Sequence, residues 1–157
     1  MLTAQIAKSA GGKVYGLVGN KTRAEYASQF NFDHLIDRNS CNWADEVMRL
    51  SDNHGADLII DGVAGPESPL NYKAIAPLGN VIYIGQMGGP PPEVNISQLI
   101  GKSFSVTGFV QFAHQKATKN AERQELYSNL IDGTWKIPIG RIGSLSEVAE
   151  LHELFEA

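Results

Sequence analysis

Short apolar segments alternate with helical patterns between Lys13 and Ile84, and this alternation constrains the fold more than any other feature of the chain. The helical patterns carry apolar residues at a spacing of three or four, which marks one face of a helix. Short connections between strands and helices are typical of parallel βαβ units with helices on both faces of a sheet. The sequence therefore predicts an α/β, Rossmann-like fold with a doubly wound, mostly parallel sheet. The predicted strands span residues 13–18, 34–36, 58–61 and 80–84, and the apolar helix faces are Tyr26 with Phe30, and Trp43 with Val47 and Leu50.

Glycine and capping residues predict where the helices begin and end. An opening helix through Leu2, Ile6 and Ala10 ends at Gly11-Gly12, where a left-handed residue is allowed. Small polar side chains at a helix start can accept hydrogen bonds from the first free amides. The predicted starts are Thr22 with Glu25, Ser68 with Pro69, and Ser144 with Glu147, the last ahead of a helix whose inner face is Val148, Leu151 and Phe155.

The second half of the chain predicts one further strand and a long helix. Apolar residues alternate with serine and threonine over 103–110, the period of a half-buried strand, and we expect this strand at the edge of the sheet. A helix is expected over about 115–131, before Gly133.

Composition excludes several classes of partner and site. A formal net charge of -4 over 157 residues argues against binding to nucleic acid or to anionic lipid. No apolar stretch is long enough to cross a membrane, and the N-terminus does not resemble a signal peptide. Cys41 is the single cysteine, and the four histidines never approach it at a zinc-ligand spacing. We therefore expect a cytoplasmic protein without a metal site, whose partners are small molecules or protein surfaces.

The residues that follow each strand are the candidates for function, because doubly wound sheets bind ligands beyond the carboxyl ends of their strands. The first strand is followed by Gly19, Asn20, Lys21 and Arg23, with no carboxylate among them. A carboxylate there would hold the ribose diol of NAD, whereas cations suit the additional 2′-phosphate of NADP. Arg38, after the next strand, could bind the same phosphate. The alternative is that these cations are ordinary solvated surface charges.

Two loops rich in glycine follow the later strands. Residues 61–65 and 84–89 contain small side chains that would let a flat ligand approach the backbone closely. Glycine after a strand is also ordinary turn chemistry, which is the competing interpretation. Asp57 and Asp61 share one side of their strand, but no second feature marks them as an acid and base pair.

Four segments in order resemble the zinc-free quinone oxidoreductase branch of the medium-chain dehydrogenase/reductase superfamily. They are AQIAKSAGGKVYGLVGN, LIIDGVAG, APLGNVIYIGQMGG and SLSEVAELHELFEA. The resemblance implies a cofactor-binding domain of an oxidoreductase that transfers hydride from NADPH to a conjugated carbonyl without a catalytic zinc. It also implies a homodimer formed through the edge strand at 103–110. By position it implies cofactor contacts from Asn20, Arg23, Arg38, Val63, Ala64, Gly85, Gln86, Phe109 and Val110, while the catalytic residues stay unassigned.

The chain departs from this family at both ends. Family members carry a first strand and a glycine-rich turn ahead of the opening helix, and a separate substrate domain ahead of that strand. We therefore expect residues 1–157 to form a single Rossmann-like domain that is incomplete relative to the family and weakly active or inactive alone. The absent strand normally lies in the middle of the sheet, so two strand edges should be unpaired.

Two other functions compete with this interpretation. The chain could be a non-catalytic dimerisation or binding module that keeps the fold without the phosphate loop. A methyltransferase of Rossmann-like fold is disfavoured, because such enzymes usually place a carboxylate where this chain has Asn20 to Arg23.

Overall fold

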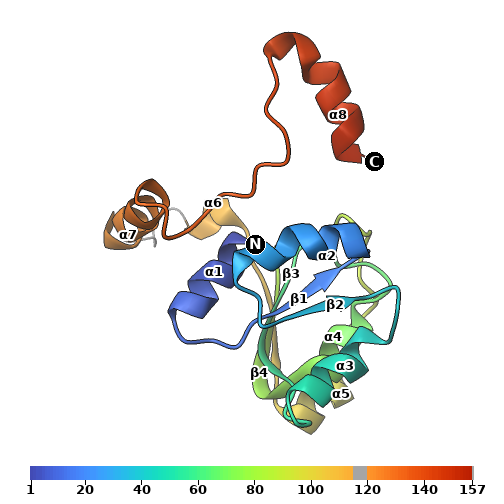
Figure 1. The fold of residues 1–157 in the computed structure, drawn as a ribbon. Helices are drawn as coiled ribbons and strands as arrows, with labels where there is room; N and C mark the ends of the chain where they lie inside the picture. Colours follow the sequence, from blue (N-terminus) through green and yellow to red (C-terminus); the bar gives the residue numbers. More distant parts are fainter. Residues whose placement is uncertain (115–119, 157) are drawn as a thin grey trace.

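The computed structural model describes residues 1–114 and 120–156, and its strands form two parallel sheets (Figure 1). The first sheet pairs β1 (Tyr15–Val18) with β2 (His34–Asp37). The second has the order β3 (Ala56–Asp61), β4 (Ile75–Tyr83) and β5 (Ser105–Gly108). The predicted α/β fold is confirmed, and so is the expected position of the 103–110 segment, since β5 lies at an edge.

Helices alternate with the strands through the first two thirds of the chain. This order confirms the βαβ pattern that the apolar periodicity predicted. The helices are α1 (Leu2–Ser9), α2 (Lys21–Ala27), α3 (Trp43–Leu50), α4 (Pro69–Ala74), α5 (Ile96–Lys102), α6 (Gln111–His114), α7 (Asn120–Ile131) and α8 (Val148–Glu156), with 3-10 turns η1 (Ser28–Phe30) and η2 (Leu145–Glu147).

Helix α3 holds the two sheets together. Its buried residues Trp43 and Val47 pack in one apolar cluster with Ile36 of β2, and Ile59 of β3 packs against the same cluster. A second cluster contains Ile75 and Val81 of β4, both fully buried, with Tyr72 of α4 and Phe104 just before β5. Burial of apolar area is the main stabilising term in such a fold. The packing of α3 therefore joins two sheets that share no strand pairing.

The inner edges of β1 and β3 are unpaired within the described part of the chain, as the sequence predicted. The Arg38 amide donates to Val18 O, and the Ile84 amide donates to Asp61 O. Backbone amides alternate in direction along a strand, so the amides of Leu17, Leu58 and Ile60 point away from the paired neighbours. The same three residues are 45%, 52% and 40% exposed.

Hydrogen exchange should report these open edges. We expect the amides of Leu17, Leu58 and Ile60 to exchange about tenfold or more faster than those of Gly16, Val18 and Ile59, which point toward paired strands. Mass spectrometry after electron-transfer fragmentation, or NMR, gives the required single-residue resolution. Equal protection of both sets would contradict the open edges.

One predicted helix start is wrong. The side chain of Asn20 accepts the Arg23 amide at 2.8 Å, so Asn20 caps α2 and Thr22 lies inside the helix. That error arises because several neighbouring residues can serve as caps, and the choice among them depends on where the chain leaves the preceding strand. The predicted start at Ser68 and Pro69 is confirmed, since α4 begins at Pro69, although the buried Ser68 hydroxyl has no hydrogen-bond partner among the described residues. The left-handed Gly11 and the capping box of Ser144 with Glu147 are confirmed.

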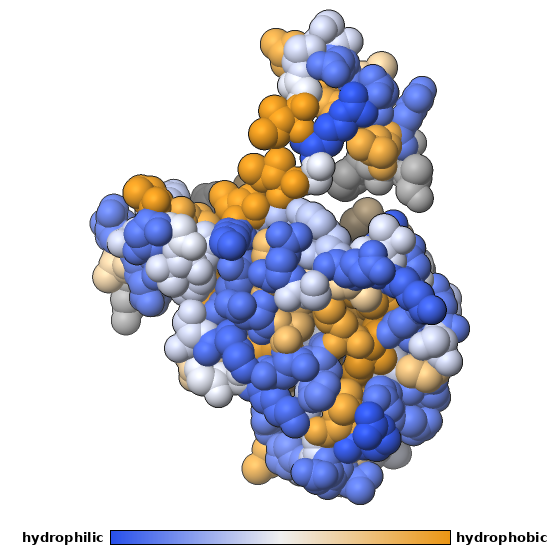
Figure 2. Space-filling view, in the orientation of Figure 1, coloured by the Kyte–Doolittle hydropathy of each residue, from blue (hydrophilic) through white to orange (hydrophobic). Residues whose placement is uncertain are grey.

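The predicted inner face of α8 does not pack against the sheets. Val148 is 49% exposed, and Figure 1 draws α8 well away from the main body; the side chain of Phe155 lies outside the described residues. The segment before α8 carries exposed Ile137, Ile139 and Ile142, and orange residues face solvent along it in Figure 2. Helical periodicity identifies an apolar face but not what covers it. For the predicted 115–131 helix, α7 confirms the part from residue 120, and 115–119 lie outside the described residues.

One C-terminal segment does dock on the main body. The side-chain amide of Gln5 donates to Lys136 O at 2.9 Å and its oxygen accepts the Lys136 amide at 2.8 Å. The Trp135 indole N–H donates to the Ser9 hydroxyl at 2.9 Å. Gln5 and Trp135 are both buried, so the turn after α7 is attached to α1 by satisfied polar contacts.

Candidate functional site

Two arginines meet at the carboxyl end of β1. The point that a β-carbon on Gly19 would occupy lies 3.9 Å from Arg23 Nη1 and 3.9 Å from Arg38 Nε. Both side chains are exposed, and within the described residues neither guanidinium forms an ion pair with a carboxylate. Two positive charges that are not neutralised therefore face the same point, which favours an anionic ligand there.

Hydrogen bonds of Asn39 hold this end of β1 against the end of β2. The Asn39 side-chain amide donates to Gly19 O at 2.6 Å, and the Asn39 backbone amide donates to Asp37 Oδ1 at 3.0 Å. Asn20, also a predicted site residue, uses its oxygen to cap α2 and has only its amide group left for a ligand. The structure thus brings Arg23 and Arg38 together and gives Asn20 a structural task. Their role in cofactor binding stays a prediction.

The loop after β3 is held by Asp61. Its Oδ1 accepts the amides of Val63 at 2.8 Å and Ala64 at 2.9 Å, and its Oδ2 accepts the side-chain amide of Asn71 at 2.7 Å. Ala64 has a φ of 54°, a left-handed conformation that is uncommon for a residue with a β-carbon. The Val63 side chain is 47% exposed and Ala64 is buried, so Val63 is the side chain of this loop that a ligand could contact.

Glycines let this loop and the loop after β4 approach each other closely. A β-carbon on Gly65 would lie 2.4 Å from Gly88 O, and one on Gly85 would lie 2.7 Å from Gly62 O. The Gly88 amide donates to Val63 O at 2.7 Å. The sequence suggested that these glycines make room for a ligand or form turns. The structure shows that Gly65 and Gly85 make room for the neighbouring loop.

The remaining predicted residues follow β4 and β5. Gln86 is exposed in the loop after β4. The Phe109 amide donates to Tyr83 O at 2.9 Å, which continues the β5 pairing, and the Phe109 ring stacks on His114 at 4.7 Å between centroids. Val110 is 56% exposed. Phe109 and Val110 therefore directly continue the carboxyl end of β5, one strand away from Gly85 and Gln86.

The family model described as zinc-binding dehydrogenase matches residues 1–126. The chain belongs to the zinc-binding dehydrogenase family. It is 26% identical to human quinone oxidoreductase over 149 residues, which is 95% of this chain and 45% of that protein. A quinone oxidoreductase from Pseudomonas syringae pv. tomato DC3000 superposes with a TM-score of 0.85 at 26% identity, over 97% of this chain and 48% of that one. The structure of a mycobacterial protein in complex with NADPH superposes with a TM-score of 0.83 at 21% identity, over 98% of this chain and 49% of that one.

This zinc-binding dehydrogenase chain spans less than half the length of these three relatives. Across residues 1–114 and 120–156, no group of three or more histidine, cysteine, aspartate or glutamate side chains could hold a metal ion. No helix among these residues combines the length and the apolar character needed to cross a membrane.

A cluster of tyrosines extends the contacts of Asp61 into the core of the chain. The Asn71 side-chain amide lies 3.3 Å from the Tyr83 hydroxyl, and the Tyr83 hydroxyl donates to the Tyr72 hydroxyl at 3.2 Å. Burial raises the pKa of Tyr72, and the neighbouring Tyr83 and Asp61 raise it further. Tyr72 is therefore a neutral hydrogen-bonding group in this cluster.

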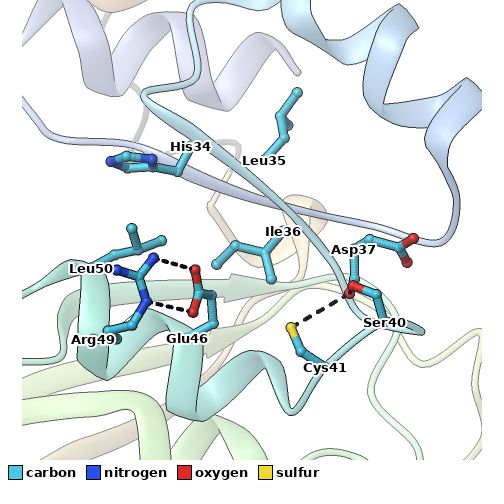
Figure 3. A pocket seen from close by; sticks show the side chains of 9 residues that line it. All are labelled: His34, Leu35, Ile36, Asp37, Ser40, Cys41, Glu46, Arg49 and Leu50. Carbon is cyan, nitrogen blue, oxygen red and sulfur yellow. Dashed lines mark hydrogen bonds and ion pairs between the residues drawn. The ribbon is translucent and has the colours of Figure 1, made fainter.

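A pocket of about 490 Å³ between β2 and α3 contains none of the nine predicted site residues (Figure 3). Within its lining Arg49 donates to Glu46 at 2.8 Å and 2.6 Å. That contact lowers the pKa of Glu46 and raises the pKa of Arg49. Cys41 is exposed at the rim, with its sulfur 3.8 Å from Asp37 O. The one arginine of this pocket is thus paired with a carboxylate, unlike the two arginines at the end of β1.

Sequence reasoning missed the structural importance of Asp61, Asn71 and Asn39. The sequence suggested Asp61 as the first residue of a glycine-rich loop and as a partner for Asp57, which instead contacts His54 at 2.8 Å. The available indication was an aspartate directly before Gly62 at a strand end, since aspartate commonly accepts amides two and three residues further on. No comparable pattern points to Asn71, because its contact with Asp61 depends on how α4 packs.

Proposed function

We propose that this chain is the cofactor-binding part of an NADPH-dependent oxidoreductase that transfers hydride to a conjugated carbonyl. The observation that carries the proposal is the meeting of Arg23 and Arg38 at Gly19, where no carboxylate neutralises them. A phosphate on the 2′-position of the adenosine ribose is the part of NADPH that NADH lacks, and paired guanidinium groups are well suited to bind it. The likeness to quinone oxidoreductases supports the same assignment.

The other predicted residues would orient the rest of the cofactor. In this proposal Val63 and Ala64 lie beside the adenosine and nicotinamide riboses, and Gly85 and Gln86 lie beside the nicotinamide. Phe109 and Val110 flank its ring. The cofactor supplies the hydride, so the task of these residues is to hold the ring and exclude water. The contacts between the two glycine loops support this arrangement, because they make a rigid surface at the ends of β3 and β4.

Isothermal titration with NADPH and NADH tests the proposal on the chain as it stands. The affinity for NADPH should exceed that for NADH by a factor of about ten or more, as expected for one charge-assisted phosphate contact. Equal binding, or tighter NADH, would contradict the arginine assignment. Binding of neither nucleotide would favour the non-catalytic module instead.

The proposal includes a small-molecule substrate and a cytoplasmic location. The relatives are about twice as long as this chain, so residues that contact a small-molecule substrate are expected in the portion that this chain does not match. A cytoplasmic location rests on the single cysteine, and the absence of nucleic-acid binding rests on the negative net charge.

A homodimer through β5 is the remaining part of the proposal. The Phe109 amide points toward β4, so by alternation the amides of Val106 and Gly108 point to the open edge of the sheet. Pairing of that edge with its copy around a twofold axis would satisfy these amides. Gly108→Pro removes one edge amide at a position with no atom within 4 Å of an added β-carbon. Sedimentation velocity should show a dimer for the unaltered chain and for Gly108→Ala, and mainly monomer for Gly108→Pro. A monomeric unaltered chain would contradict the dimer.

A further inference from the structure

Asp61 uses both carboxylate oxygens to connect two elements and one loop. It ends β3, accepts two amides of the loop at 62–65, and accepts Asn71 of α4. Asn71 is 4% exposed and also contacts Tyr83 at the end of β4. We call Asp61, Asn71, Tyr83 and Tyr72 the Asp61 network.

The loop at 62–65 needs such support because part of its backbone is strained. Ala64 has a φ of 54° and Gly65 a φ of 84°. A left-handed residue with a β-carbon is strained and persists only where its surroundings enforce it. Here Asp61 binds the amides of Val63 and Ala64, and Gly88 binds Val63 O. The Val63 backbone is thereby satisfied within the protein, and its half-exposed side chain is what the loop presents outward.

We propose that Asp61, held in place by Asn71, is a positioning residue for the nucleotide. It keeps the loop at 62–65 in the one conformation that presents Val63 to the cofactor. The inference rests on the proposed function, because it takes this loop to be part of the cofactor site.

An aspartate is required at position 61 because both oxygens must accept hydrogen bonds. In Asp61→Asn one oxygen becomes an NH2 group, which would face either the Asn71 amide or the amides of Val63 and Ala64. Two donors in contact leave at least one unpaired, which costs binding or stability. The reciprocal change Asn71→Asp supplies the missing acceptor. The double variant Asp61→Asn/Asn71→Asp therefore restores the contact between positions 61 and 71 with donor and acceptor exchanged. The Tyr83 hydroxyl then turns to donate to position 71 and accepts from the Tyr72 hydroxyl.

The experiment measures NADPH affinity and amide exchange in four proteins: the unaltered chain, Asp61→Asn, the double variant and Asp57→Asn. Asp57→Asn is the matched control, since it makes the same change on the same strand at a side chain that is 84% exposed. Affinity is measured at a temperature where every variant is folded. Asp61→Asn should weaken NADPH binding about tenfold and accelerate exchange of the Val63 and Ala64 amides. The NADPH affinity of the double variant should return to within about threefold of that of the unaltered chain. Asp57→Asn should bind NADPH as tightly as the unaltered chain does.

The outcomes separate this inference from the proposed function. If the unaltered chain binds NADPH and Asp61→Asn binds it equally well, the positioning role is wrong and the proposed function stands. A double variant that binds NADPH as weakly as Asp61→Asn also overturns the role. Loss of affinity through the contact between positions 61 and 71 should be repaired by exchanging donor and acceptor, so a loss that is not repaired has another cause. If the unaltered chain binds no NADPH, the proposed function fails and the positioning role fails with it.

Discussion

Replacing Arg23 and Arg38 together by alanine should weaken NADPH binding about 100-fold while changing NADH binding no more than about twofold. The reason is that both guanidinium groups lie 3.9 Å from the same point beside Gly19, where the proposal places the 2′-phosphate. NADH has a hydroxyl group at that position, so its binding affinity depends little on the two arginines. Isothermal titration with each nucleotide at fixed ionic strength measures the change, and the effect should shrink as salt is added.

Lys21→Ala is the control for this experiment. It removes one positive charge from the same short helix, but no atom of Lys21 lies within 4 Å of the point beside Gly19. A change of no more than about twofold in NADPH affinity is expected from the loss of a screened charge. If Lys21→Ala weakened NADPH binding as much as the double arginine variant, general electrostatics would explain the preference. A double variant that still prefers NADPH would place the phosphate elsewhere.

Gly65→Ala should destabilise the chain by about 3 kcal/mol, from the left-handed backbone and the clash combined. Gly65 has a φ of 84°, and the added β-carbon would lie 2.4 Å from Gly88 O. A backbone oxygen cannot move aside as a flexible side chain can, so the two glycine loops would have to separate. Urea denaturation followed by circular dichroism measures the free energy of unfolding.

Gly89→Ala separates the two causes of that loss. Gly89 has a φ of 95°, close to that of Gly65, but nothing lies within 4 Å of its added β-carbon. We expect a loss of about 1 kcal/mol, which is the cost of the backbone conformation alone. Equal losses in the two variants would mean that the approach of the loops contributes nothing. In that case the rigid surface assumed for the cofactor would lose its support.

The candidate site was partly predictable because its cations are local to strand ends. Arg23 and Arg38 follow β1 and β2, and parallel neighbouring strands bring their carboxyl ends together whatever the details of packing. The sequence indicated that Gly65 and Gly85 allow a close approach to the backbone, but it did not predict which group approaches them. The distance between two loops depends on how β3 and β4 align, and no single segment contains that information.

By itself the sequence determined the α/β class, the order of the strands along the chain and the left-handed Gly11, because these depend on local periodicity and backbone sterics. The tertiary structure alone decided which residue caps α2, how α3 joins two separate sheets, and that Asp61 binds Asn71 across ten residues. It also left Val148 of α8 exposed, although its helical pattern predicted burial. An apolar or polar side chain expresses only a preference for a partner, and which partner it meets is set by the path of the rest of the chain.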